Sequence, residues 1–141
     1  MREDLPLDAD ELRRWREEAD RALRSARIQA EAGVANWACF LAEQAAQLGL
    51  KGLLHGLGRG PWGHDLVRLA EMVSAAGVEL PAAVSDSLKR LSRHYIPARY
   101  PDAHGAGSPG AHYSRADAEE AIADAEAALR FVDDTWESLG G

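Results

Sequence analysis

The sequence predicts an all-α protein, an up-and-down bundle of about five helices, built as a single domain over residues 1–141. Three observations support this fold class. Apolar residues make up 46% of the chain, enough for a core without metal or disulfide, and Cys39 is the only cysteine. Alanine is abundant and β-branched residues are few, which favours helix over strand. Apolar residues recur at helical spacing in five segments: 8–31, 34–55, 64–76, 81–95 and 115–138.

The first two of these helices carry clear signals in the sequence. Asp8 and Glu11 have capping-box spacing, and Gly33 suits the end of the first helix. The second helix, 34–55, is apolar on nearly all sides, so we expect it at the centre of the bundle. Six large side chains across the chain are predicted to be buried: Trp37, Leu41, Leu48, Leu88, Ile122 and Leu129.

The remaining helices have recognisable starts. The glycine-rich stretch 56–63 follows no strand and precedes no Lys-Ser/Thr, so we interpret it as a turn and not as a phosphate cradle. We expect His64 to make a local cap or a core hydrogen bond. Ser114 is predicted to cap the last helix, with Asp117 three residues further on.

The most basic part of this acidic chain is the stretch 89–104. It carries four cations and one acid, a charge of +3, whereas the whole chain carries −7. Pro97 and Pro101 must end any helix that enters it. We therefore expect this segment to hold a phosphate or another anion, with four contributing residues: Arg90, Arg93, Arg99 and Tyr100. The overall acidity argues against non-specific coating of nucleic acid.

Arg99 and His104 are the candidate catalytic residues. An arginine stabilises charge on a phosphate and a histidine moves a proton near neutral pH, so the pair suits metal-free cleavage of RNA through its own 2′-hydroxyl. The alternative is ordinary: His104 is a solvated loop histidine, and Arg93 lies on the polar face of the fourth helix. The five histidines show no metal-ligand spacing, so we expect no metal and no cofactor. The N-terminus lacks a signal-peptide pattern and no apolar run reaches membrane length, so a cytoplasmic location is expected.

Four stretches of the chain resemble the HEPN domain family (higher eukaryotes and prokaryotes nucleotide-binding). The third is the most distinctive, because it contains the string Tyr-Ile-Pro-Ala-Arg-Tyr-Pro-Asp. The stretches are Trp37–Leu54, Gly63–Leu66, Leu91–Ala103 and Tyr113–Ile122.

The resemblance implies a helical bundle that is often dimeric and is associated with a small nucleotidyltransferase, in many cases as a toxin–antitoxin pair. Catalytic members of the family are metal-independent ribonucleases whose motif is Arg, four to six residues, then His, at the contact of two subunits. Arg99 and His104 fit that spacing. Tyr100 and Gly105 depart from it, since the family usually has a polar residue after the arginine and a tyrosine soon after the histidine. A further departure is Gln47-Leu48, where the family usually has an acid and a basic residue.

Three hypotheses follow. The first is a nucleotide- or RNA-binding protein that acts with a nucleotidyltransferase partner, and the second is a ribonuclease that uses Arg99 and His104. The third is a structural bundle without a ligand. We also expect a two-fold homodimer that buries parts of the second helix and of residues 90–104. Arg99 and His104 should lie near each other on a polar groove.

Overall fold

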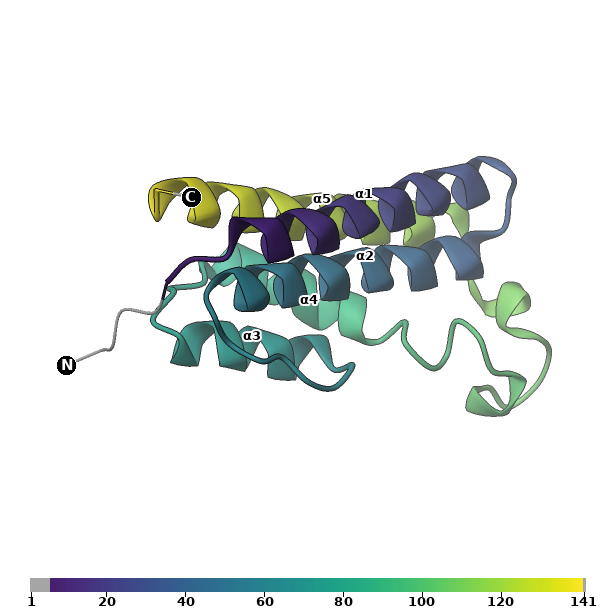
Figure 1. Cartoon of the computed structure of the whole chain (residues 1–141). Coiled ribbons are helices and arrows are strands. Elements are labelled where there is room, and N and C mark those ends of the chain that lie inside the picture. The colour runs from purple at the N-terminus through teal and green to yellow at the C-terminus, as the bar shows by residue number, and fades with distance from the viewer. Residues whose placement is uncertain (1–5, 141) are drawn as a thin grey trace.

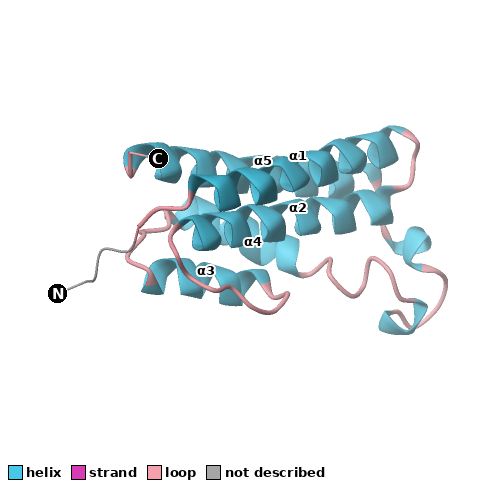
Figure 2. Ribbon diagram, in the orientation of Figure 1, coloured by secondary structure: helices cyan, strands magenta, loops and turns pink. Residues whose placement is uncertain are grey.

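The computed structural model describes residues 6–140, and within this range every regular element is a helix. Five α-helices follow one another (Figures 1 and 2), with two short 3₁₀ helices, η1 and η2, before the last. Their bounds are α1 Ala9–Glu31, α2 Ala35–Gly56, α3 Leu66–Ala75, α4 Ala82–Ser92, η1 Pro101–Ala103, η2 Pro109–His112 and α5 Arg115–Ser138. The all-α class and the five predicted helices are confirmed.

The long helices α1, α2 and α5 run side by side, and the shorter α3 and α4 complete the bundle (Figure 1). α2 contacts each of the other four α-helices, as its apolar surface requires. Glycines allow its close approach to α1 and α5. A Cβ atom on Gly52 would lie 2.8 Å from the Cβ of Trp15, and one on Gly56 would lie 2.8 Å from the ring of Trp136.

The predicted caps explain where several helices begin and end. Asp8 accepts a hydrogen bond from the backbone N–H of Glu11, and Gly33 ends α1 with a positive φ of 81°. Ser114 and Asp117 form a reciprocal capping box at the start of α5. The cap of α3 is Asp65, whose carboxylate accepts from Val67 N–H. The expected cap or core hydrogen bond of His64 is therefore not its role: His64 is exposed and stacks on Tyr95.

Two expectations about α2 and α4 need correction. Trp37 was predicted to be buried, but its side chain is 43% exposed and has an edge-on contact with the ring of Phe40, one helical turn further along α2. α4 was expected to continue to residue 95, but it ends at Ser92 and the chain turns through residues 93–99. Pro97 disfavours a helical conformation in the residue before it, so the helix stops early.

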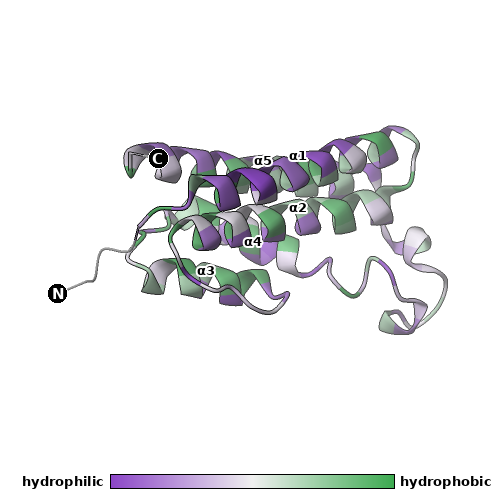
Figure 3. Cartoon of the chain, viewed as in Figure 1, coloured by the Kyte–Doolittle hydropathy of each residue, from purple (hydrophilic) through white to green (hydrophobic). Residues whose placement is uncertain are grey.

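The core is made largely of alanine and leucine (Figure 3 shows the hydropathy along the helices). Leu88 and Leu129 are buried as predicted, at 1% and 3% exposure. Leu41, Leu48 and Ile122 are only half-buried and pack against the edge of the core. None of the described helices is long and apolar enough to cross a membrane.

Candidate functional site

The segment that follows α4 is held against the start of α2. Asn36 is buried, and its side-chain amide donates a hydrogen bond of 3.0 Å to the backbone carbonyl of Ala98, which is itself buried. The segment then passes through η1 and η2 before α5 begins (Figure 1). This attachment fixes the backbone next to Arg99, although most of the segment has no regular structure.

Arg99 lies among three aromatic rings, and we call this group, Arg99 with Phe40, Tyr95 and Tyr100, the Arg99 cluster. Its guanidinium carbon is 4.4 Å from the ring centre of Phe40, 4.6 Å from that of Tyr95 and 4.7 Å from that of Tyr100. Its Nε donates to the backbone carbonyl of Tyr95 at 2.8 Å. No carboxylate of the described residues forms an ion pair with it. The rings therefore orient the charge of Arg99 without neutralising it.

His104 is tied to the same turn by a different contact. Its Nε2 donates to the backbone carbonyl of Pro97 at 2.6 Å, and its ring stacks on that of His112, with centroids 4.2 Å apart. A neutral histidine that donates through Nε2 keeps a lone pair on Nδ1. Both predicted catalytic residues are thus anchored to the turn at residues 95–97, but no hydrogen bond or ring contact between described atoms joins Arg99 to His104.

The other predicted phosphate contacts are in different environments. Arg90 is paired with Asp124 through two hydrogen bonds, of 2.8 and 3.0 Å, and these bonds raise the pKa of its guanidinium. Arg93 is exposed at the end of α4. Next to Arg93 in the chain, His94 is buried and hydrogen-bonded to the hydroxyl of Tyr113 at 3.2 Å. Burial and the charge of Arg93 lower the pKa of His94, while burial raises the pKa of Tyr113 to about 12.

Comparison with known proteins identifies the family. The sequence model of the HEPN domain matches residues 12–135. This chain belongs to the HEPN family. Its helical bundle superposes on that of TT1696 from Thermus thermophilus with a TM-score of 0.84 and 41% identity, over 87% of this chain and 96% of that one.

Two further HEPN structures are similar to it. ST0689, an archaeal HEPN homologue, is 32% identical with a TM-score of 0.75 and covers 88% of this chain and 96% of its own. A HEPN domain protein from Thermotoga maritima is 30% identical with a TM-score of 0.72, over 88% of this chain and 98% of that one. No curated protein gave a significant match.

Sequence reasoning missed one ionisable residue of this HEPN protein, Glu43. Its side chain is fully buried and accepts hydrogen bonds from the amides of Gln44, at 2.9 Å, and Gln47, at 2.7 Å. Burial raises its pKa from 4.5 to about 7, against the lowering effects of the two amides and of the charges of Arg99 and Lys51. The signal was present, because Glu43 is the only acid in the apolar segment 34–55.

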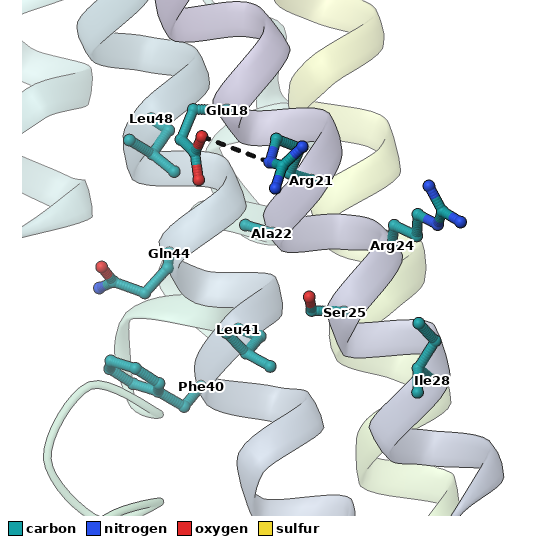
Figure 4. Close-up of a pocket in the computed structure, with 10 residues that line it drawn as sticks. All are labelled: Glu18, Arg21, Ala22, Arg24, Ser25, Ile28, Phe40, Leu41, Gln44 and Leu48. Atoms are coloured by element: carbon teal, nitrogen blue, oxygen red, sulfur yellow. Dashed lines mark ion pairs between the residues drawn. The ribbon is translucent and has the colours of Figure 1, made fainter.

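A groove of about 540 Å³ lies between α1 and α2, beside the Arg99 cluster (Figure 4). Phe40 belongs to both, since it lines the groove and contacts Arg99. The rest of the lining comes from both helices, and its charged residues all lie on α1: Glu18, Arg21, Ala22, Arg24, Ser25, Ile28, Leu41, Gln44 and Leu48. Within residues 6–140, no three His, Cys, Asp or Glu side chains are placed to hold a metal ion.

Proposed function

We propose that this HEPN protein binds RNA or a nucleotide at the Arg99 cluster. The observation that carries the proposal is the guanidinium of Arg99, which is oriented by three rings and one backbone carbonyl and has no carboxylate partner among the described residues. A planar guanidinium held in this way keeps N–H donors for a phosphate. The conclusion is a site for one phosphate with aromatic surface around it.

The aromatic surface suits a base next to that phosphate. Tyr100 is 45% exposed although it contacts Arg99, so one of its faces remains available for stacking. Trp37 is also exposed and packs edge-on against Phe40, at 5.8 Å between centroids. Aromatic side chains beside an arginine bind single-stranded nucleic acid with little dependence on sequence. In this role Arg93 is a secondary phosphate contact. Arg90, the other predicted contact, is held by Asp124 and would reach a phosphate only by leaving that carboxylate.

The test is fluorescence anisotropy with a labelled RNA oligomer of about ten nucleotides. Arg99→Ala should weaken binding by roughly tenfold or more, because a charge-assisted phosphate contact and its stacking surface are both disturbed. Arg130→Ala is the matched control: it removes one exposed arginine from α5, away from the cluster. Equal affinities for the two variants would contradict the proposal. Competition with AMP shows whether a single nucleotide is sufficient.

A ribonuclease that uses Arg99 and His104 is the second candidate. The observation in its favour is the hydrogen bond from His104 Nε2 to the Pro97 carbonyl, which leaves Nδ1 as a proton acceptor. In such a reaction Nδ1 takes the proton of a ribose 2′-hydroxyl, whose oxygen attacks the neighbouring phosphorus, while Arg99 stabilises the charge that develops on the phosphate. The bond from phosphorus to the 5′-oxygen breaks, and the leaving 5′-oxygen takes a proton from the protonated His104 or from water. No metal enters this mechanism.

We also propose that two copies of the chain associate through the groove of Figure 4. Ile28 lines the groove and is exposed, and the exposed ring of Trp37 packs against Phe40, which also lines the groove. The polar rim is self-complementary: Glu18 and Arg24 lie about two turns apart on α1, so an antiparallel partner places each acid near an arginine of the other copy. Such a dimer brings a second subunit next to the Arg99 cluster, since Phe40 is shared.

The partner that the family resemblance implies is a small nucleotidyltransferase, in a pair of the toxin–antitoxin kind. Co-expression with a nucleotidyltransferase encoded next to this gene, followed by size-exclusion chromatography, tests the pairing. A stable complex supports it. If the protein forms no complex and binds no RNA, the structural bundle without a ligand is the better description.

A further inference from the structure

A second cavity lies between the start of α3 and the end of α4, outside the Arg99 cluster. Its volume is about 550 Å³, within the range of small-molecule sites. Tyr95 belongs to the Arg99 cluster and to this cavity, because it contacts Arg99 and also lines the cavity. Five other lining residues matter for its chemistry: His64, Asp65, Arg93, Ile96 and Pro97.

One wall of the cavity is formed by two nearly parallel rings. His64 and Tyr95 have centroids 5.9 Å apart and an angle of 12° between their planes. His64 is exposed, and the apolar side chains of Ile96 and Pro97 lie beside Tyr95 in the lining. A flat aromatic ring fits such a wall better than an aliphatic ligand does, because stacking adds to the burial of apolar area.

The polar groups of the cavity carry opposite charges. Arg93 is exposed and makes no ion pair or side-chain hydrogen bond to any described residue. Asp65 uses one carboxylate oxygen to accept from Val67 N–H at 3.0 Å. A carboxylate accepts more than one hydrogen bond, so Asp65 keeps capacity for a donor on a ligand.

We propose that this cavity binds one base of a single-stranded RNA whose neighbouring phosphate lies at the Arg99 cluster. The base stacks on His64 and Tyr95, Arg93 contacts its own phosphate, and Asp65 accepts from an exocyclic amino group. Cytosine has such a group and uracil, of the same size, does not, so the subsite prefers cytosine to uracil. This inference rests on the proposed function, and it assigns the subsite that gives the binding a base preference.

The experiment compares labelled oligocytidylate and oligouridylate of about ten nucleotides by anisotropy. The wild type should bind the cytidine oligomer roughly tenfold more tightly, the scale of a hydrogen bond to a charged acceptor. Asp65→Asn preserves the helix cap, since asparagine also caps well, and should abolish that preference. Ser92→Trp, which fills the cavity from its α4 side, should weaken binding of the cytidine oligomer by about fivefold or more.

Arg93→Ala and Arg68→Ala form a matched pair for the phosphate contact. Both remove one exposed arginine, but Arg68 lies over the ring of Trp62 and does not line the cavity. Only Arg93→Ala should lower the affinity. If the wild type binds both oligomers but with no preference, and Ser92→Trp and Arg93→Ala bind as the wild type does, the subsite is wrong while the proposed function stands. If the wild type binds neither oligomer, the proposed function itself fails and the subsite with it.

Discussion

The last turn of α4 and the segment that follows it carry arginines in very different surroundings. Arg90, on the helix, faces α5 and makes two hydrogen bonds to Asp124, a carboxylate that is only 6% exposed. Arg99, in the segment, contacts three rings and a backbone carbonyl. The first arginine is part of the helix packing. The second has no ion-pair partner among the described residues, which is the basis of the proposed phosphate site.

The two arginines show that the net charge of a sequence stretch differs from the charge that remains unpaired in the folded structure. Residues 89–104 carry +3 in sequence, but the position of Arg90 on α4 directs it to an acid 34 residues further along the chain. Beyond Ser92 no acid of the described helices forms an ion pair with Arg99, and the turn places its guanidinium beside the ring of Phe40 of α2. The predictions that follow probe this contrast between helix and segment, beginning with the largest expected effect.

The largest effect is expected on RNA cleavage by the segment that follows α4. If this protein cleaves RNA, His104→Ala should reduce the rate in EDTA on the order of a hundredfold or more, because a general acid–base residue is lost. His55→Ala, which alters a histidine stacked on Trp15 at the other end of α2, should keep the rate. A wild type that cleaves while His104→Ala cleaves equally well would place the chemistry elsewhere. A wild type that does not cleave RNA in EDTA would exclude the ribonuclease candidate and leave binding as the function.

The pH dependence of stability tests whether the buried carboxyl group of Glu43 is ionised and could neutralise the charge of Arg99. Its pKa is raised to about 7 in the folded protein, so between about pH 4.5 and 7 the folded state binds more protons than the unfolded state. The free energy of unfolding should therefore fall as the pH rises through this window. Glu43→Gln removes the titrating group and should be more stable than the wild type above pH 7 by up to roughly 3 kcal/mol, with little difference at pH 4.

Urea unfolding of the wild type and of Glu43→Gln at several pH values checks this expectation. Arg99 and Lys51 are the charged groups that act on Glu43, so Arg99→Ala should extend the fall of stability to higher pH, since it removes a charge that favours the ionised acid. A wild type whose stability rises with pH by more than that of Glu43→Gln would mean that Glu43 is ionised and paired in the folded state.

The next prediction concerns the groove between α1 and α2, the proposed contact between two copies of the chain. Leu41→Arg puts a charge at the centre of the proposed dimer contact and should raise the dimer dissociation constant at least about tenfold. Val67→Arg is the control, because Val67 is an accessible apolar residue on α3 outside the groove. Sedimentation equilibrium measures the dimer dissociation constant of each variant. Equal dissociation constants, or a wild type that is monomeric at micromolar concentration, would exclude this surface.

The smallest effect concerns Arg90 itself. Arg90→Ala leaves the buried carboxylate of Asp124 without its cation, so the melting temperature should fall by a few degrees. Arg115→Ala removes an exposed cation paired with Glu119 and should lower the melting temperature less. Differential scanning calorimetry compares the two variants. An Arg90→Ala protein as stable as the wild type would show that the pair with Asp124 adds nothing to the fold.

The helices could be predicted because their signals are local. Apolar residues at helical spacing and caps such as Asp8 and Ser114 lie within a few residues of the helix ends that they determine. Burial was less predictable, since an apolar residue such as Trp37 can lie on an exposed face of a helix that is otherwise apolar.

The site could be predicted only in part. The sequence indicated the segment and named Arg99 and His104, but the partners of its cations are distant in sequence: Phe40 is in α2 and Asp124 is in α5. Such contacts depend on how the helices pack, and no local pattern encodes them. The role of His64 as a stacking partner of Tyr95 is of the same kind.

The salt dependence of RNA binding separates the two arginines. Arg90→Ala and Arg99→Ala remove the same charge from the same stretch, so their effect on net charge is equal. We measure the slope of the logarithm of the association constant for RNA against the logarithm of the salt concentration. The slope should become shallower by about one for Arg99→Ala, because one phosphate contact is lost. It should stay at the wild-type value for Arg90→Ala. A slope that changes for Arg90→Ala and not for Arg99→Ala would contradict the assignment of Arg99 as the phosphate contact.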